Sequence, residues 1–174
     1  EHGQLFRGVR KNQRIDDSLP LDGASWAALF FLSIGEEEKA RRCLAVIEER
    51  FISHADGIAG YKPYSGEPVY EDERVNSYYF PGDREKTWKD LDLVWVEGSL
   101  GVALAYIKAG DRKRGVEIVE SMLPLRLEGG FRYASRDVSY QFSTYPSVAS
   151  TAWFVLAVAM LTNEVVEAVF WQGG

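Results

Sequence analysis

The sequence predicts an all-α fold made of helical hairpin repeats, joined by long aromatic loops that leave room for short strands. The main observation is an internal repeat, because the residues from Asp22 to Gly35 align without a gap with those from Glu97 to Gly110. Each segment ends in glycine and continues into a charged start and a second helical pattern. A third copy begins near Tyr145. Self-similarity of this kind indicates a repeat architecture.

The first helix is predicted to begin at Asp22, after a loop formed by residues 1–19. Asp22 is a good N-cap, because its carboxylate can accept from backbone amides of the first turn and its charge complements the helix dipole. From Trp26 to Ile34 the helix is apolar on nearly all sides, which is typical of a helix enclosed by others. Gly35 is expected to end it.

The second helix of each hairpin shows one apolar stripe and one charged side. After Gly35, apolar residues including Cys43 recur at three- and four-residue spacing. The equivalent pattern covers residues 112–123, and Pro124 ends it. Residues 163–170 are predicted to pair with the third apolar segment. The hairpins cover about 22–53, 93–126 and 146–170 of a single domain spanning 1–174.

Two connections lack a helical period and are rich in aromatic residues. They cover residues 53–90 and 128–144. Connections longer than roughly 12–15 residues are uncommon unless they bind something, are disordered or contain short strands. The aromatic content argues against disorder, and residues 69–70 and 77–80 favour short strands.

Composition excludes several classes of partner. With 174 residues, 46% of them apolar, the chain is long enough for one globular core. The net charge of −6 argues against a nucleic-acid partner. The apolar run 148–161 is shorter than a bilayer-spanning helix, so no membrane partner is expected. No signal-peptide pattern is visible, which favours the cytoplasm but leaves the compartment open.

Three short segments resemble the α/α toroids of the six-hairpin glycosidase-like superfamily. They are residues 94–100 (VWVEGSL), 129–135 (GGFRYAS) and 143–153 (STYPSVASTAW). In that superfamily helical hairpins form an inner and an outer ring, and substrate sites lie at the mouth, near the N-terminal ends of inner helices. The resemblance implies that the chain forms part of an α/α toroid with carbohydrate as its partner.

The chain departs from that superfamily in the number of hairpins, because a closed ring has six and this sequence supplies three. Half a ring would expose the flanks of enclosed helices, and apolar patches of that size are normally covered. Two explanations stay open. Either the sequence is a fragment of a larger toroid, whose other hairpins lie in the same protein or in a separate half-toroid chain, or a second copy of this chain completes the ring in a homodimer.

Asp22 and Glu97 are the candidate catalytic residues. Glycoside hydrolysis uses one carboxyl as the acid and another as base or nucleophile. The two residues occupy equivalent repeat positions, so a toroid would place both near one mouth. The division of roles expected here is Glu97 as acid, with its pKa raised by the flanking Trp95, and Asp22 as base. The alternative is that both carboxylates simply cap their helices.

Aromatic residues near the helix starts are the candidate substrate-binding groups, since a flat ring can stack on a sugar face. For each of them core packing is an equally good interpretation. No metal site and no cofactor are expected, because the two histidines have no cysteine pair beside them and no phosphate-binding glycine loop follows a strand. The candidate binding residues are Trp26, Trp88, Trp95, Tyr79, Tyr133 and Tyr145.

Two other functions compete with carbohydrate chemistry. A toroid similar to the terpenoid cyclases and prenyltransferases would hold an isoprenoid in an aromatic cavity, although the Asp-x-Asp-Asp motif is missing. A helical-repeat interaction module would have no small-molecule site. An acidic, aromatic groove favours sugar, a closed apolar cavity favours isoprenoid, and a flat surface favours the interaction module.

Overall fold

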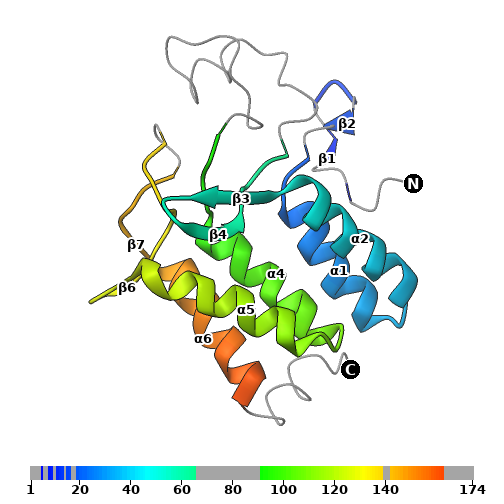
Figure 1. The fold of residues 1–174 in the computed structure, drawn as a ribbon. Helices are drawn as coiled ribbons and strands as arrows, with labels where there is room; N and C mark the ends of the chain where they lie inside the picture. Colours follow the sequence, from blue (N-terminus) through cyan, green and yellow to red (C-terminus); the bar gives the residue numbers. More distant parts are fainter. Residues whose placement is uncertain are drawn as a thin grey trace.

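The fold combines helices with short strands. Within the described residues, five α-helices alternate with seven strands that pair in three antiparallel sheets. The expectation of an all-α fold of helical hairpins is therefore wrong, and the protein is mixed α/β. The aromatic connections pair as strands because their backbone N–H and C=O groups need partners when they are buried. The computed structural model describes residues 5, 8–9, 11–13, 15–16, 19–65, 91–138 and 142–162 (Figure 1).

The first helix pair consists of α1 (Asp22–Ser33) and α2 (Glu37–Arg50). Gly35 lies between them with φ +76°, a conformation that favours glycine. The Glu36 N–H then donates to the Phe31 carbonyl at 2.8 Å and closes the end of α1. α1 buries small residues, whereas α2 buries one stripe and exposes its charged side.

The second pair, α4 (Val96–Lys108) and α5 (Arg112–Met122), is joined in the same way. Gly110 has φ +88°, and the Asp111 N–H donates to the Tyr106 carbonyl at 3.0 Å. Most of α4 is buried, including both of its glycines. Such burial needs a helix without a polar side, which is the pattern of its sequence.

α6 (Val148–Thr162) is apolar on all sides. The Ser147 hydroxyl caps it by accepting from the Ser150 N–H at 3.3 Å. One side of α6 is open, since Val148 is 88% exposed. The partner helix predicted over residues 163–170 lies outside the described residues. None of the described helices is long and apolar enough to cross a membrane.

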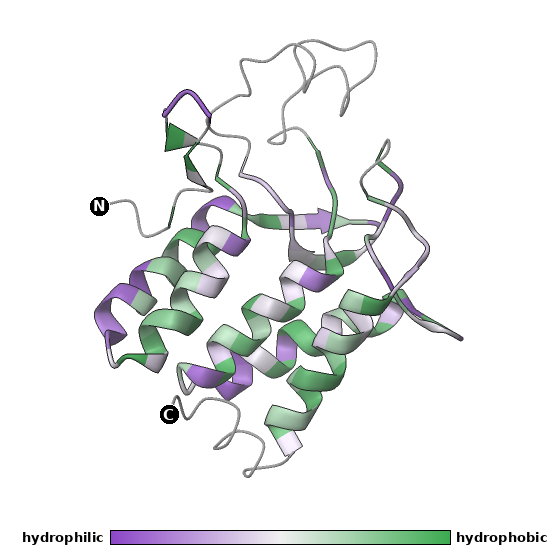
Figure 2. Cartoon of the chain, turned by 180° about the vertical axis from the view of Figure 1, so that it is seen from behind, coloured by the Kyte–Doolittle hydropathy of each residue, from purple (hydrophilic) through white to green (hydrophobic). Residues whose placement is uncertain are grey.

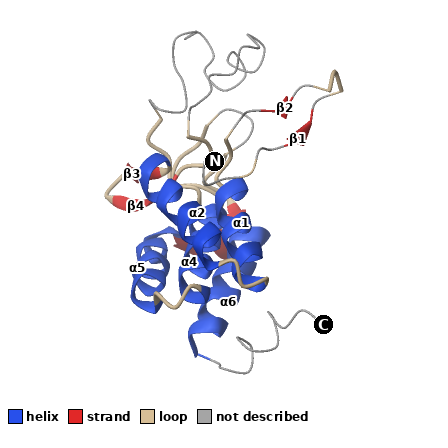
Figure 3. Cartoon of the chain, turned by 90° about the vertical axis from the view of Figure 1, so that its right-hand side faces the viewer, coloured by secondary structure: helices blue, strands red, loops and turns tan. Residues whose placement is uncertain are grey.

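α1, α4 and α6 lie side by side with α4 in the middle, and α2 and α5 cover them from one side (Figures 1 and 3). A Cβ atom on Gly98 would lie 2.8 Å from Leu21 Cδ2, and one on Gly101 would lie 3.9 Å from Ser25 Oγ. These pairs follow the same order along both helices, so α1 and α4 run parallel. Figure 2 shows that most residues of these inner helices are apolar.

The strands gather at the end where α1, α4 and α6 begin (Figure 1). One two-residue connection is an Asp56-Gly57 turn, in which both residues have positive φ, +54° and +78°. This turn joins the strands of the second sheet. The strands are β1 (Gly8–Val9) with β2 (Ile15–Asp16), β3 (Ile52–Ala55) with β4 (Ile58–Tyr61), and β5 (Arg126–Leu127) with β6 (Gly130–Arg132) and β7 (Pro146–Ser147); a 3-10 turn, η2 (Leu123–Leu125), precedes β5.

The sequence repeat reappears in the backbone hydrogen bonds of this end. The Leu21 N–H donates to the Pro63 carbonyl at 2.8 Å, and the Val96 N–H donates to the Tyr133 carbonyl at 3.1 Å. Both donors and both acceptors are aligned pairs of the repeat. The repeating unit is therefore a helix pair plus a strand segment that returns to the start of its own first helix. Equivalent antiparallel bridges join Pro20 to Tyr64 and Trp95 to Ala134.

Candidate functional site

Asp22 and Glu97 lie at the same end of the molecule, in the first turns of the parallel helices α1 and α4. The two helix starts touch where Leu21 meets Gly98. A side chain larger than hydrogen at position 98 would collide with Leu21 and with the ring of Trp95. Glycine therefore permits the close approach that brings the two carboxyl groups together.

Neither carboxylate caps its helix. The N-cap of α1 is Leu21 and that of α4 is Trp95, and neither helix start has a side-chain cap hydrogen bond. The prediction that Asp22 is an N-cap is therefore wrong. Asp111 shows what a capping carboxylate looks like in this chain, since its Oδ1 accepts from the Arg114 N–H at 3.0 Å. Capping thus does not account for the carboxyls of Asp22 and Glu97.

Both carboxyl groups hold their protons more tightly than usual. Burial raises the pKa of Asp22 to about 6. Burial also raises the pKa of Glu97, and the negative charge of Asp22 adds to the effect. Two carboxylates that share a half-buried site disfavour simultaneous ionisation. Because a protonated carboxyl is what a general acid needs, Asp22 suits the acid role as well as Glu97 does.

An open pocket of about 600 Å³ lies beside Asp22. Trp26 forms part of its wall, is 53% exposed and stacks on Trp153 with ring centroids 6.3 Å apart. Tyr64 and Phe30 add further rings to the wall. The pocket thus combines one carboxyl with an aromatic surface, and the sequence-based choice of Trp26 as a binding residue is compatible with its position.

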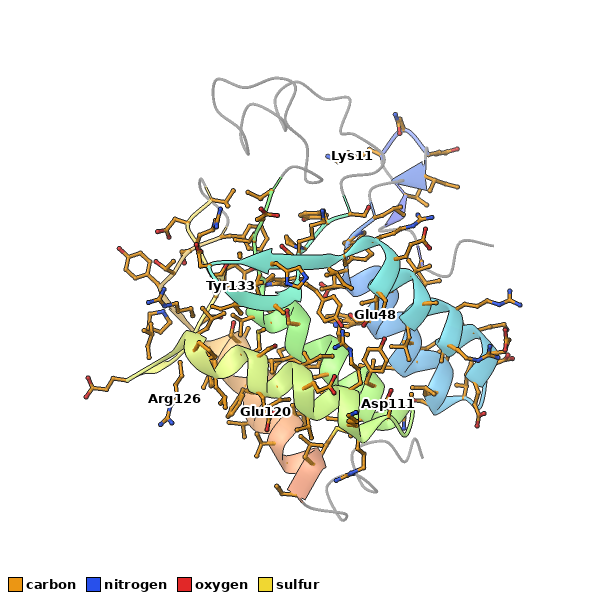
Figure 4. All side chains as sticks on the ribbon, in the orientation of Figure 1. Lys11, Glu48, Asp111, Glu120, Arg126 and Tyr133 are labelled. Atoms are coloured by element: carbon orange, nitrogen blue, oxygen red, sulfur yellow. The ribbon has the colours of Figure 1, made fainter. Side chains whose placement is uncertain are left out.

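Tyr133 lies close to the carboxyl pair. Its pKa is raised by burial, then by the negative charge of Glu97, and to a smaller extent by that of Asp22. Its ring stacks on Phe142 with centroids 5.3 Å apart and an interplanar angle of 6°. Figure 4 shows Tyr133 at the strand end of the molecule. Its hydroxyl therefore lies close enough to the two carboxyls to sense their charge.

Trp95 is enclosed in the core, whereas a residue that stacks on a sugar ring was expected to be exposed. It is 7% exposed, and its ring packs edge-on against Tyr133 and Phe142. Its indole Nε1 has no hydrogen-bond partner in the described part of the chain. The Trp95 side chain nevertheless lowers the pKa of Tyr133, in keeping with the edge-on contact of the two rings.

The remaining predicted residues fall outside this group. Tyr145 is 75% exposed, and its link to the site is a backbone one, because its carbonyl accepts from the Tyr133 N–H at 2.9 Å. Trp88 and Tyr79 lie outside the described residues. Sequence reasoning missed Tyr64, although the aligned repeat segments 60–65 and 130–135 both return to a helix start and so gave a signal for it.

Among the residues that the structure describes, no group of three or more His, Cys, Asp or Glu side chains could hold a metal ion. The polar side-chain groups that the structure brings together here are the carboxyls of Asp22 and Glu97 and the hydroxyl of Tyr133. No protein-family model, curated protein or solved structure matches the chain.

Proposed function

We propose that the pocket beside Asp22 binds carbohydrate and that Asp22 and Glu97 hydrolyse a glycosidic bond there. The observation that carries the proposal is the pair itself. Two half-buried carboxyls lie at adjoining helix starts, and neither accepts a side-chain cap hydrogen bond. Burial raises the pKa of both, and the charge of Asp22 further raises that of Glu97. Carboxyls that serve only stability are normally paired or hydrogen-bonded.

The reaction needs one protonated and one ionised carboxyl. The acid gives its proton to the glycosidic oxygen as the bond from that oxygen to the anomeric carbon breaks. The base takes a proton from the water whose oxygen bonds to the anomeric carbon, or acts itself as nucleophile. Repulsion between two neighbouring carboxylates favours the singly protonated state of the pair. The exposed face of Trp26 would support the sugar ring beside them.

Isosteric neutral variants test the proposal. Glycan-array binding and release of reducing sugar are measured for the wild type, Asp22→Asn and Glu97→Gln. Both variants should keep glycan binding and lose hydrolysis by about 10²–10⁴-fold, the usual contribution of a positioned acid or base. Glu49→Gln, an exposed carboxyl on α2, is the control and should cleave like the wild type. Undiminished cleavage in either site variant would remove that residue from catalysis.

Leaving-group dependence separates the acid from the base. A substrate with a good leaving group needs little protonation, so the variant that lacks the acid should recover most of its rate on an aryl glycoside with an acidic phenol. The variant that lacks the base should stay slow on every substrate. Recovery in Glu97→Gln supports the assignment made from the sequence, and recovery in Asp22→Asn reverses it.

One observation favours a second function, that of a protein-interaction module. Val148 and Val155 of α6 are 88% and 61% exposed, and they border a further pocket of about 550 Å³ with mainly apolar lining. Apolar side chains exposed together on one helix often mark an interface. This function would be favoured if the protein binds no glycan but associates with itself or with another protein, and if the variant Val148→Asp weakens that association.

A further inference from the structure

α6 has one open apolar face in the described structure, whereas α1 and α4 are each packed against a partner helix. We propose that residues 163–170 of the same chain cover this face and fill the pocket of about 550 Å³ that lies along it. The inference does not depend on the carbohydrate proposal. It names an occupant for the surface that would otherwise serve an interaction module.

Two equivalent hydroxyl contacts fix the register between α4 and α6. The Tyr61 N–H donates to Ser99 Oγ, and the Phe131 N–H donates to Thr151 Oγ1, both at 3.0 Å. Each hydroxyl in turn donates to the backbone carbonyl four residues earlier, both at 2.8 Å. Ser99 and Thr151 therefore occupy the same place in the second and third units of the repeat.

This register identifies the face of α6 that a partner helix should cover. In the second unit α5 packs on Ala103 and Ile107 of α4, because a Cβ atom on Gly115 would lie 3.2 Å from the Ala103 carbonyl oxygen and 2.5 Å from Ile107 Cγ1. The same step along the chain that leads from the hydroxyl of α4 to that of α6 leads from Ala103 to Val155 and from Ile107 to Ala159. A third partner helix should therefore pack on Val155 and Ala159.

The structure leaves this face open. Val155 is 61% exposed, whereas its counterpart Ala103 is 0% exposed. Val155 and Ala159 both line the pocket. Other positions of α6 face the core, where Ala157 and Met160 are buried. The pocket thus coincides with the place that α5 fills on α4.

The chain that follows α6 is suited to this place. α6 ends at Thr162, and Asn163 is one of the few residue types besides glycine that adopt positive φ, as Gly35 and Gly110 do at the two earlier turns. Eight residues of helix rise about 12 Å. A helix over 163–170 that runs back along α6 would therefore reach the level of Val155.

The pattern of this segment gives such a helix one apolar side. Its two acids, Glu164 and Glu167, are three residues apart and would share the opposite side. In the second unit the large Ile107 meets Gly115, whereas in the third the small Ala159 leaves space for larger side chains. The residues that would fill this space are Val165, Val166, Val169 and Phe170.

The same segment has an advantage over any other occupant. Because it is joined directly to the end of α6, it acts at an effective concentration on the order of millimolar. A second copy of the chain or another protein would have to displace it. The covalent connection therefore favours a contact within the chain.

Cross-linking tests the inference on the full chain. In a Cys43→Ala background, the pair Val155→Cys and Val169→Cys should form a disulfide within one chain on mild oxidation. The expected signs are a faster band on a non-reducing gel and the loss of two hydrogens from the intact mass. The control pair joins Val169→Cys with Glu49→Cys on the exposed side of α2, and it should form no disulfide within the chain.

Thiol accessibility is a second readout. In the same background, the thiol of Val155→Cys should react with a maleimide at least about tenfold more slowly than that of Glu49→Cys, because the covering segment must open first. Adding Val169→Asp should restore fast labelling at position 155, since a charged side chain is not buried there without a partner. Adding Glu167→Lys, on the opposite side of the segment, should leave the labelling slow.

The outcomes decide what covers α6. A disulfide between chains, with a dimeric mass of the wild type in sedimentation, would overturn the inference, because a second copy then covers the face. Fast labelling at position 155 without a cross-link would also overturn it, because the face is then open. A disulfide within the chain supports the inference and removes this face as a free interface. Glycan binding is measured separately, so its failure would affect only the proposed function.

Discussion

The carboxyl group of Glu48 and those of Asp22 and Glu97 differ in their hydrogen-bond partners. Glu48 of α2 accepts from the Tyr61 hydroxyl at 2.6 Å and from the Tyr106 hydroxyl at 2.9 Å, and both of its oxygens face Arg114, at 3.2 and 3.0 Å. Asp22 and Glu97 have no described donor, although they too are half buried. Figure 4 shows Glu48 among the side chains between the helices.

This difference shows which carboxyls stabilise the packing of the elements. Glu48 ties α2 to β4, α4 and α5 through one network, because its partners come from those three elements. Burial and the Glu48 charge both raise the pKa of Tyr61 and of Tyr106, so the tyrosines remain protonated donors. Asp22 and Glu97 hold nothing together in the described structure. Their burial costs stability, which is typical of groups kept for function.

The largest effect is expected from Glu48→Ala. This change leaves the part-buried hydroxyls of Tyr61 and Tyr106 without their acceptor and removes one of the two ion-pair partners of Arg114, so the free energy of unfolding should fall by about 3 kcal/mol. Urea denaturation measures the loss. Glu49→Ala, the exposed neighbour, should change stability by less than about 0.5 kcal/mol. A similar small value for Glu48→Ala would show that the network is not structural.

The next largest loss of stability is expected at the contact between the starts of α1 and α4. In Gly98→Ala the new Cβ would collide with Leu21 and Trp95, so α1 and α4 must separate and the free energy of unfolding should fall by about 2 kcal/mol. Gly101→Ala is the matched control on the same helix, because its Cβ would meet only Ser25 Oγ at 3.9 Å. That change should stabilise the protein by about 0.5–1 kcal/mol through helix propensity. Equal losses in both variants would contradict the packing argument.

The helices could be predicted from the sequence more readily than the strands. Periodicity and the glycines at positions 35 and 110 predicted α1, α2, α4 and α5 close to their observed bounds. The strands are two to four residues long, which is too short for an alternating pattern to stand out. The Asp56-Gly57 pair was a local signal for the hairpin of β3 and β4 that the all-α expectation did not use. The position of that hairpin on the helices depends on distant residues, since the Tyr61 N–H donates to Ser99 Oγ, 38 residues away.

The sequence likewise predicted one part of the candidate site and not the other. The repeat placed Asp22 and Glu97 at one end because equivalent positions of parallel helices must lie together. The roles of the aromatic residues could not be predicted, since Trp26 follows Asp22 and Trp95 precedes Glu97 in equally apolar surroundings, and neither position tells whether the ring is enclosed. Packing leaves Trp26 half exposed and encloses Trp95 against Tyr133 and Phe142. Which ring is available to a ligand is decided by tertiary contacts.

A capping carboxylate should have a smaller effect than Glu48. Asp111→Ala removes the bond from the Arg114 N–H to Oδ1 at the start of α5, and the free energy of unfolding should fall by about 1 kcal/mol. Asp111→Asn should recover most of the loss, because the amide oxygen can still accept. Thermal unfolding at pH 7 measures both. A loss of 3 kcal/mol or more would mean that Asp111 also supports the Arg114 network.

The smallest expected effect is a gain in stability, from the variant Asp22→Asn. The pKa of Asp22 is raised in the folded state to about 6, so ionising this group favours the unfolded chain, and the cost to stability grows as the pH rises from about 4 to above 6. Asp22→Asn removes the cost and should therefore stabilise the protein at pH 7.5. Because the carboxyl is partly solvated and loses a favourable helix-dipole contact, the gain should be about 1 kcal/mol or less. At pH 3.5, where Asp22 is protonated in the folded protein and largely protonated in the unfolded chain, the difference should nearly vanish. Thermal unfolding of both proteins at the two pH values decides the matter, and a variant less stable than the wild type at pH 7.5 would mean that the carboxylate does hold a structural partner.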